Sequence, residues 1–261
     1  MPRGKLIVST RWPSEIVLVR HGQSVGNIAA REAGRRGAAR LDLDVRDADT
    51  PLSDTGREQS RAVGAFLKAG AESECPELIV CSPYRRAAET AAAAVEAWGC
   101  AHEVVLDERL RERDLGVFDG LTSAGIKAEY AAEAERRSRV GKFYYQPPSG
   151  ESWCDVTLRV RSLLADLREG YEGKRVWLFT HQAVIMAFRF LLESLTEQEL
   201  LRIDGSTPLG NCSLTVYRPT SDGGLDLVVY GDVDHLEESK AEPTHEEPHG
   251  VGAVTAAGDR S

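Results

Sequence analysis

Segments rich in β-branched residues are each followed, within a few positions, by side chains that can handle phosphate. These side chains are Arg20 and His21 after residues 16–19, Arg86 after residues 78–80, Glu112 after residues 104–106, and His181 after residues 176–179. A guanidinium group binds phosphate through two parallel hydrogen bonds and keeps its charge. Imidazole is nucleophilic near neutral pH, and a carboxyl group can protonate a leaving alcohol. The set suits phosphoryl transfer, although Arg85 and Glu108 are alternatives on the same loops.

The elements that must position these groups alternate between strands and helices. Helices are predicted over residues 55–69, 86–98 and 156–168, each of which lies beside or between the expected strands. This alternation predicts an α/β fold, a three-layer sandwich in which a mostly parallel sheet carries helices on both faces. Residues 213–217 and 225–230 flank a turn and predict one antiparallel edge hairpin. Ligands of open α/β sheets bind beyond the carboxyl ends of the strands, where the side chains above should gather.

The chain divides into a short N-terminal extension over residues 1–13, one domain over residues 14–235 and a tail over residues 236–261. The tail is acidic, contains prolines and glycines and lacks apolar periodicity, so it is expected to be disordered. Two segments, at about residues 28–50 and 122–149, interrupt the alternation and are interpreted as insertions over one end of the sheet. Arginines in both insertions are either solvated helix charge or an extension of the anion site.

Composition limits the function classes. The chain has 261 residues, 42% of them hydrophobic, and a formal net charge of −9, which fits a globular protein and disfavours a nucleic-acid partner. No apolar run approaches the ~20 residues of a membrane helix, and the N-terminus lacks the apolar core of a secretory signal. Five cysteines, an odd number without a CxxC pair, favour free thiols and a cytoplasmic location. His245 and His249 have a helical metal-ligand spacing, but neighbouring prolines argue against that helix. The oligomeric state stays open.

Six ordered motifs resemble those of the histidine phosphatase superfamily, also called phosphoglycerate mutase-like. They are Arg20-His21-Gly22-Gln23-Ser24 with Asn27; Pro51-Leu52-Ser53 with Gly56 and Gln59; Ser82-Pro83 with Arg86-Ala87 and Thr90; Leu110 and Glu112 with Gly116 and Gly120; Gly150-Glu151-Ser152; and Thr180-His181. The resemblance covers about residues 14–218. It selects Arg86 over Arg85 and Glu112 over Glu108.

The resemblance implies a phosphomonoesterase that acts through a phosphohistidine on a small phosphorylated metabolite, with no cofactor and no metal. His21 is the implied nucleophile, Glu112 the proton donor, and Arg20, Arg86 and a protonated His181 the phosphate-binding groups. The candidates for further substrate contacts are Asn27, Gln23, Ser24, Gln182 and Tyr145. Gln182 stands where one branch of the family has an aspartate, which favours Glu112 as the acid.

Three alternatives to a phosphatase remain: a mutase, a phosphate-binding module without strong catalysis, and a serine hydrolase. The type of phosphatase is a separate question. The segments His181–Val184 and Phe143–Ser152 are similar to those of fructose-2,6-bisphosphatases, in which residues near the second segment contact the sugar phosphate. Tyr144 and Tyr145 could equally pack a lid. A cofactor-dependent phosphoglycerate mutase, or a catalytically weak phosphate-binding module of the same fold, would carry the same motifs. A serine hydrolase is disfavoured because the chain has no G-x-S-x-G elbow.

Overall fold

A computed structural model describes residues 12–71, 75–207 and 209–245. Its single sheet has six strands in the order β3-β2-β4-β1-β5-β6. The strands are β1 (Glu15–Arg20), β2 (Leu78–Cys81), β3 (Val104–Leu106), β4 (Arg175–Thr180), β5 (Leu214–Pro219) and β6 (Leu225–Asp232). Strands β3, β2, β4 and β1 are parallel, whereas β5 pairs antiparallel with β1 and with β6. The predicted mostly parallel sheet with one antiparallel edge hairpin is confirmed.

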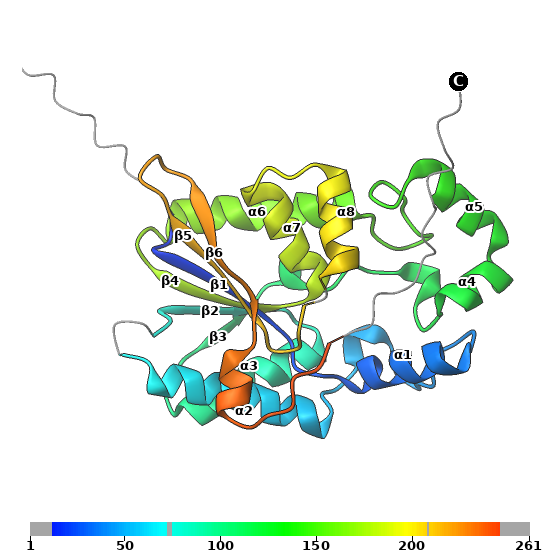
Figure 1. The fold of residues 1–261 in the computed structure, drawn as a ribbon. Helices are drawn as coiled ribbons and strands as arrows, with labels where there is room; N and C mark the ends of the chain where they lie inside the picture. Colours follow the sequence, from blue (N-terminus) through cyan, green and yellow to red (C-terminus); the bar gives the residue numbers. More distant parts are fainter. Residues whose placement is uncertain (1–11, 72–74, 208, 246–261) are drawn as a thin grey trace, which may run out of the picture.

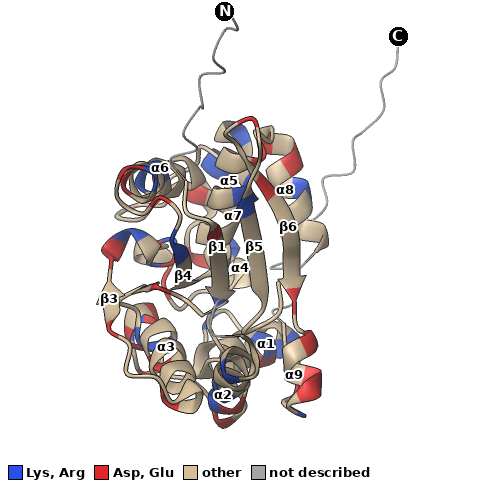
Figure 2. Cartoon of the chain, turned by 90° about the vertical axis from the view of Figure 1, so that its left-hand side faces the viewer, with Lys and Arg blue, Asp and Glu red and all other residues tan. Residues whose placement is uncertain are grey.

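Helices cover both faces of the sheet and complete the predicted three-layer sandwich (Figure 1). The helices are α1 (Val25–Arg36), α2 (Asp54–Ala69), α3 (Arg85–Trp98), α4 (Ser123–Glu129), α5 (Ala131–Val140), α6 (Trp153–Gly170), α7 (Gln182–Leu192), α8 (Glu197–Ser206) and α9 (Asp234–Glu238). Helices α6 and α7 lie on one face, and α2, α3 and α9 lie on the other. Seen from the side, charged residues gather on the outer surfaces of the helices (Figure 2).

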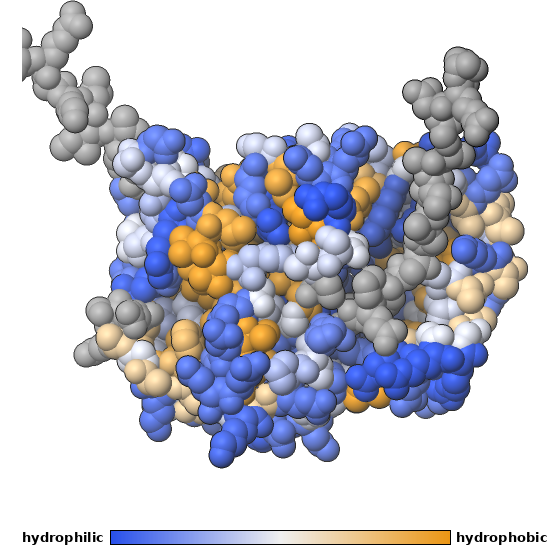
Figure 3. All heavy atoms as spheres, in the orientation of Figure 1, coloured by the Kyte–Doolittle hydropathy of each residue, from blue (hydrophilic) through white to orange (hydrophobic). Residues whose placement is uncertain are grey.

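The two hydrophobic cores follow from the alternation of side chains along the strands. In β1, Ile16 and Leu18 pack with the α6–α7 layer, while Val17 and Val19 pack with the α2–α3 layer. A strand that is buried on both faces has a continuous run of apolar residues in the sequence. The central strands are recognisable in the sequence for this reason. The β5–β6 edge is less covered, and hydrophobic residues surface over it (Figure 3); Val228 is 47% exposed.

The two predicted insertions lie together beyond the carboxyl ends of the parallel strands. The first contains α1 and a short 3₁₀ turn, Asp47–Asp49, and the second contains α4 and α5 (Figure 1). Backbone hydrogen bonds join them, from Leu41 N to Gly120 O and from Thr122 N to Ala39 O. The exposed Arg40 pairs with Glu129 across the same junction. The insertions therefore form one cover over that end of the sheet.

The predicted disorder of the tail is wrong for residues 236–245. Helix α9 packs on α2, where Leu236 is fully buried and the ring of His235 lies 5.7 Å from that of Phe66. Ala241 and Thr244 are also buried. These buried side chains are spaced too irregularly among acidic residues to produce an apolar periodicity in the sequence. The segment is ordered because of its tertiary contacts. Residues 1–11 of the predicted extension and residues 246–261 of the predicted tail, including His249, lie outside the described residues.

Candidate active site

The loop that follows β1, residues 21–24, carries the proposed nucleophile and is held by backbone contacts. His21 is 2% exposed, and its N–H donates to Thr180 O at the end of β4 (2.9 Å). A Cβ on Gly22 would lie 2.6 Å from Gly56 O, and one on Gly56 would lie 2.0 Å from Gln23 O. Both positions therefore require glycine, because the loop rests directly on the first turn of α2. This contact explains why the two motifs occur together.

The ring of His21 has a defined tautomer. Its Nδ1 donates to Gly22 O at 2.8 Å, and a carbonyl can only accept. The proton is therefore on Nδ1, and Nε2 keeps its lone pair. Arg86 Nε donates to this Nε2 at 3.3 Å, which fits the same assignment. Burial and the charges of Arg86 and Arg20 lower the pKa of His21 well below its ordinary value, so the ring stays neutral.

Arg86 contacts the ring of His21, and an acidic residue of the first insertion binds the same guanidinium group. Arg86 is the second residue of α3 and is 5% exposed. Besides its contact with His21, its Nη1 lies 3.0 Å from Asp47 Oδ1 and its Nη2 donates to Asp47 Oδ2 (3.1 Å). Its Nη1 also donates to the Asp47 carbonyl (2.6 Å). Arg85, by contrast, is exposed and pairs with Glu89, so the structure places Arg86 in the site.

His181 lies beside His21, with 5.1 Å between the ring centroids. It directly follows β4 and is fully buried. Its Nε2 lies 2.8 Å from Ser82 Oγ, while its Nδ1 is buried without a hydrogen-bond partner among the described residues. Burial, Arg86 and His21 lower the pKa of His181 well below its usual range. The protein alone thus favours a neutral ring, and the predicted protonated form needs the negative charge of a bound phosphate.

Arg20, the last residue of β1, is 1% exposed. Its Nη1 donates to Leu209 O, which fixes one end of the guanidinium. The charge of Arg20 contributes to the lowered pKa of both His21 and His181. Arg20 and Arg86 therefore concentrate positive charge around the imidazole pair, the environment that a phosphate dianion requires.

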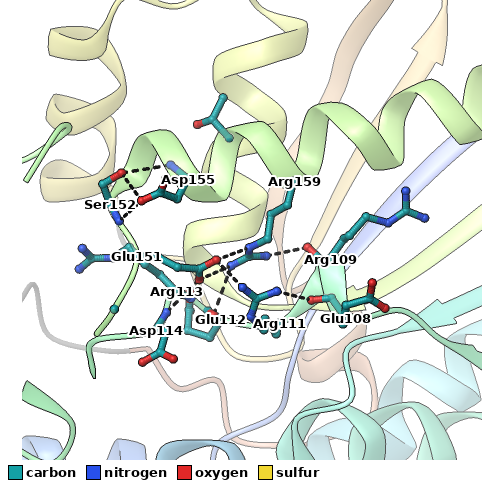
Figure 4. A network of polar contacts seen from close by, with 12 residues as sticks. Glu108, Arg109, Arg111, Glu112, Arg113, Asp114, Glu151, Ser152, Asp155 and Arg159 are labelled. Carbon is teal, nitrogen blue, oxygen red and sulfur yellow. Dashed lines mark hydrogen bonds and ion pairs between the residues drawn. The ribbon is translucent and has the colours of Figure 1, made fainter. Parts of the chain in front are cut away.

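Glu112 lies on the loop after β3. Charged side chains of the segment Gly150-Glu151-Ser152 and of α6 hold this loop in place (Figure 4). Arg159 donates to Arg109 O (2.6 Å) and Glu112 O (3.3 Å). It also pairs with Glu151 (3.0 Å), whose other oxygen accepts from Asp114 N (3.1 Å). The Glu112 carboxylate itself accepts from the backbone N–H of Arg113 at 2.7 Å. The clamp formed by Glu151 and Arg159 thus fixes the backbone that carries the proposed acid.

Two predicted substrate contacts, Gln23 and Ser24, lie on the same loop as His21, and a third, Asn27, lies in the first turn of α1; each has a structural partner. Ser24 caps α1 by accepting from Asn27 N (3.1 Å), and Asn27 Oδ1 accepts from Ser24 N (2.9 Å). The amide oxygen of Gln23 accepts from Ser53 Oγ (2.8 Å), and Gln23 is buried. The structure therefore places Gln23 and Ser24 in the support of the loop.

Gln182 is the first residue of α7, directly after His181, and belongs to a charged cluster. Its Nε2 donates to Asp204 Oδ1 (3.0 Å), and Lys142 donates to the other oxygen of that carboxylate (2.9 Å). The cations of Lys142 and Arg113 each lie 5.7 Å from the ring centre of Trp153. Burial lowers the pKa of Arg113. Polar and charged side chains thus surround Gln182 at the start of α7.

Tyr145 lies elsewhere. It is 3% exposed, packs with Phe118 and Leu121 between the insertions, and donates its hydroxyl to Glu133 (2.7 Å). Burial raises its pKa to about 12. Tyr144 is 53% exposed and donates to Glu197. These contacts favour the lid-packing alternative for Tyr145, whereas Tyr144 is exposed and contacts α8.

Most arginines of the insertions are exposed helix charge. Arg36 and Arg139 form ion pairs with glutamates on their own helices, and both side chains remain mostly exposed. Arg137 differs, because it is half-buried and burial lowers its pKa. The segments that the structure describes contain no group of three or more His, Cys, Asp and Glu side chains that could hold a metal ion.

The sequence did not single out two supporting residues of the loop. Asn211 Nδ2 donates to His21 O (3.1 Å), and Thr90 Oγ1 accepts from Gly22 N (3.0 Å). Thr90 was visible as a motif position without a role, whereas Asn211 had no signal in one sequence. The contact between Asp47 and Arg86 was equally hidden, because it joins an insertion to α3.

Comparisons with known proteins identify the family of the chain. The sequence profile of the histidine phosphatase superfamily (branch 1) matches residues 16–232. The chain belongs to this superfamily of phosphate-handling enzymes. It is 33% identical over 174 residues to a 6-phosphofructo-2-kinase/fructose-2,6-bisphosphatase of Caenorhabditis elegans, which aligns with 66% of the chain, while the chain spans only 33% of that relative.

Two further comparisons cover nearly the whole of the matched protein. A probable phosphoglycerate mutase of Photorhabdus laumondii is 29% identical over 85% of this chain and 95% of its own length. A solved structure of a mycobacterial glucosyl-3-phosphoglycerate phosphatase with VO₃ is 30% identical, with a TM-score of 0.65 over 84% of this chain and 100% of that chain. No helix in the described segments is both long and apolar enough to cross a membrane.

Proposed function

We propose that the protein hydrolyses the phosphomonoester of a small polar metabolite through a phosphohistidine at His21. The observation that carries this proposal is the fixed tautomer of His21. Its Nδ1 proton is held by Gly22 O, so the lone pair of Nε2 lies on the side of Arg86. A buried, neutral imidazole beside two buried arginines is suited to attack a bound phosphate.

In the proposed reaction, the substrate phosphate docks on Arg20, Arg86 and His181, with Asn27 beside them. Nε2 of His21 attacks phosphorus in line as the bond to the ester oxygen breaks, and Glu112 gives its proton to that oxygen. Glu112 then takes a proton from water, whose oxygen attacks phosphorus as the P–N bond breaks. The arginines stabilise charge on the equatorial oxygens, where losing one such donor costs on the order of 10²–10³ in rate.

The leaving group lies on the side of the Gln182 cluster in this scheme. Asp204, Lys142 and Arg113 make those surroundings polar and charged, which favours a hydroxylated or anionic metabolite over an apolar ester. The glucosyl-3-phosphoglycerate phosphatase has a substrate of this kind by name. All five cysteines are free, two of them buried, which supports a cytoplasmic setting for the reaction.

The test is hydrolysis of p-nitrophenyl phosphate with a chelator present, by the wild type, His21→Ala and His102→Ala. His102 is the matched control, because its Nε2 contacts Pro76 O and it lies before β3, at the opposite end of the sheet. We expect chelator-resistant activity that His21→Ala loses and His102→Ala keeps. Rapid acid-free quenching should trap an acid-labile phosphate on His21. Activity that survives in His21→Ala would refute the assigned nucleophile.

Phosphoglycerate mutase is the second candidate, because the Photorhabdus relative carries that name over nearly its whole length. A mutase must exclude water from its phosphohistidine, and the two joined insertions cover that end of the sheet. Incubating the chain with 3-phosphoglycerate and a bisphosphoglycerate separates the two activities. Release of inorganic phosphate supports the phosphatase, whereas formation of 2-phosphoglycerate without release supports the mutase.

A further inference from the structure

A one-way chain of hydrogen bonds leaves the catalytic loop on one side and returns to it on the other. Gln23 N donates to Gln59 Oε1 (2.9 Å), and Gln59 Nε2 donates to Thr244 Oγ1 (2.8 Å). Thr244 Oγ1 donates to Asn211 Oδ1 (3.0 Å), and Asn211 Nδ2 donates to His21 O (3.1 Å). We call Gln59, Thr244 and Asn211 the loop-support ring.

The two backbone groups at the ends of the loop-support ring, Gln23 N–H and His21 O, determine the direction of every hydrogen bond in it. The backbone N–H of Gln23 can only donate, so the amide oxygen of Gln59 faces it and the NH₂ group faces Thr244. The single hydroxyl proton of Thr244 is therefore available for Asn211 Oδ1. The NH₂ group of Asn211 then faces His21 O, which can only accept. Thr244 is the link that sets the orientation of the Asn211 amide.

The ring is buried, and Thr244 enters it from the C-terminal segment. Gln59 is 0%, Asn211 1% and Thr244 8% exposed, so water does not replace a lost partner easily. The segment is tied down by hydrogen bonds from Asn211 N to Thr244 O (2.7 Å) and from Gln59 Nε2 to Glu242 O (2.7 Å). The segment that sequence patterning treats as a tail is thus in contact with the support of the nucleophile.

We propose that Thr244 is a positioning residue, which holds His21 in line with the phosphorus atom through Asn211 and Gln59. The proposal rests on the proposed function, since it assigns a role in that reaction. Asn211 Nδ2 also lies 3.4 Å from Asn27 Oδ1, so one amide aligns the nucleophile and a predicted phosphate contact together. Loss of the Thr244 hydroxyl frees the Asn211 amide to rotate, and the backbone carbonyl of His21 loses a directed donor.

The test compares Thr244→Val, Thr244→Ala and Thr244→Ser in the full chain, with Thr157→Val as the matched control. Thr157 is 3% exposed, and its hydroxyl donates only to Trp153 O within α6. The measurements are kcat and KM for p-nitrophenyl phosphate and the Kd values of inorganic phosphate and orthovanadate. Vanadate mimics the in-line geometry and depends on alignment of the nucleophile, whereas phosphate binding depends mainly on the cations. Circular dichroism checks the fold.

We expect the valine and alanine variants to lose about tenfold or more in kcat and in vanadate affinity, because small misplacements of a nucleophile are costly. KM and the phosphate Kd should stay within about twofold, and Thr244→Ser and Thr157→Val should resemble the wild type. A folded Thr244→Val or Thr244→Ala chain with wild-type kcat and vanadate Kd would overturn the positioning role alone. So would equal loss of phosphate and vanadate binding, which would indicate general damage. A wild type that neither hydrolyses the ester nor binds vanadate would overturn the proposed function as well.

Discussion

Replacing Asp47 by asparagine is expected to tighten the binding of inorganic phosphate about five- to tenfold. In the structure, both carboxylate oxygens of Asp47 lie 3.0–3.1 Å from the terminal nitrogens of Arg86. A substrate phosphate that docks on Arg86 must replace this carboxylate. The insertion therefore supplies an internal competitor for the proposed phosphate site.

The magnitude follows from the burial of the two partners. At an effective dielectric constant of 20, two unit charges about 4 Å apart attract by about 4 kcal/mol, whereas exposed ion pairs contribute about 0–1 kcal/mol net. Arg86 is 6% and Asp47 47% exposed at the side chain, so the pair lies toward the exposed end of this range. We take the net attraction between Arg86 and Asp47 as about 1–1.4 kcal/mol, which corresponds to a five- to tenfold change in phosphate affinity. Asparagine preserves the shape and the backbone carbonyl contact to Arg86 while it removes the charge.

The assay is competitive inhibition of p-nitrophenyl phosphate hydrolysis by inorganic phosphate. We expect a lower inhibition constant and a lower KM in Asp47→Asn, with kcat changed less than twofold. Asp49→Asn is the matched control, since Asp49 lies in the same 3₁₀ turn and pairs with the exposed Arg46. An unchanged or higher inhibition constant in Asp47→Asn would refute the competition, and a large fall in kcat would instead indicate a direct chemical role for Asp47.

Three further outcomes follow from other parts of the structure. Arg159→Ala should lower kcat about tenfold, because the backbone of Glu112 loses its clamp. It should lower the free energy of unfolding by only about 2 kcal/mol, measured by urea denaturation, because Glu151 keeps Arg111 as an ion-pair partner. Unchanged kcat would show that the clamp does not position the acid. Gly22→Ala should abolish activity and lower the melting temperature, because its Cβ would contact Gly56 O at 2.6 Å. His235→Phe should flatten the loss of stability below about pH 6.5. Burial lowers the pKa of His235, so in mildly acidic solution the unfolded chain binds a proton there that the folded chain does not bind. The stability of the fold therefore falls as the pH drops through the pKa of the unfolded chain. Melting temperatures that shift equally between pH 7 and pH 5 in both proteins would contradict this.

The fold was predictable because its central strands are buried on both faces. Residues 16–19 and 176–179 stand out as continuous apolar runs, and they became β1 and β4 with a residue added at each end. The convergence of the candidate site residues was predictable for a related reason. The carboxyl ends of parallel strands meet at one edge, so the positions after each run had to converge, as His21 and His181 do.

The remaining parts of the site depend on contacts between segments that are distant in the chain. Asp47 was visible only as one acid among several in an insertion, and nothing in the local pattern pairs it with Arg86. Thr244 lies in a segment with the composition of a disordered tail, and its burial depends on Asn211 and Gln59. A hydrogen-bond network has no periodicity, so it leaves no signal of the kind that identifies a strand or a helix.

Electrostatics explain why such supports are needed at this site. Arg20 and Arg86 are both buried next to His21, and each favours the neutral form of that ring. A neutral imidazole has no charge of its own to be attracted into place, so its position has to be set by hydrogen bonds to the ring and the backbone. Gly22 O holds the ring, while Asn211 and Thr180 hold the backbone. The two cations that would attract phosphate in the proposed reaction thus leave the proposed nucleophile dependent on its neutral supports.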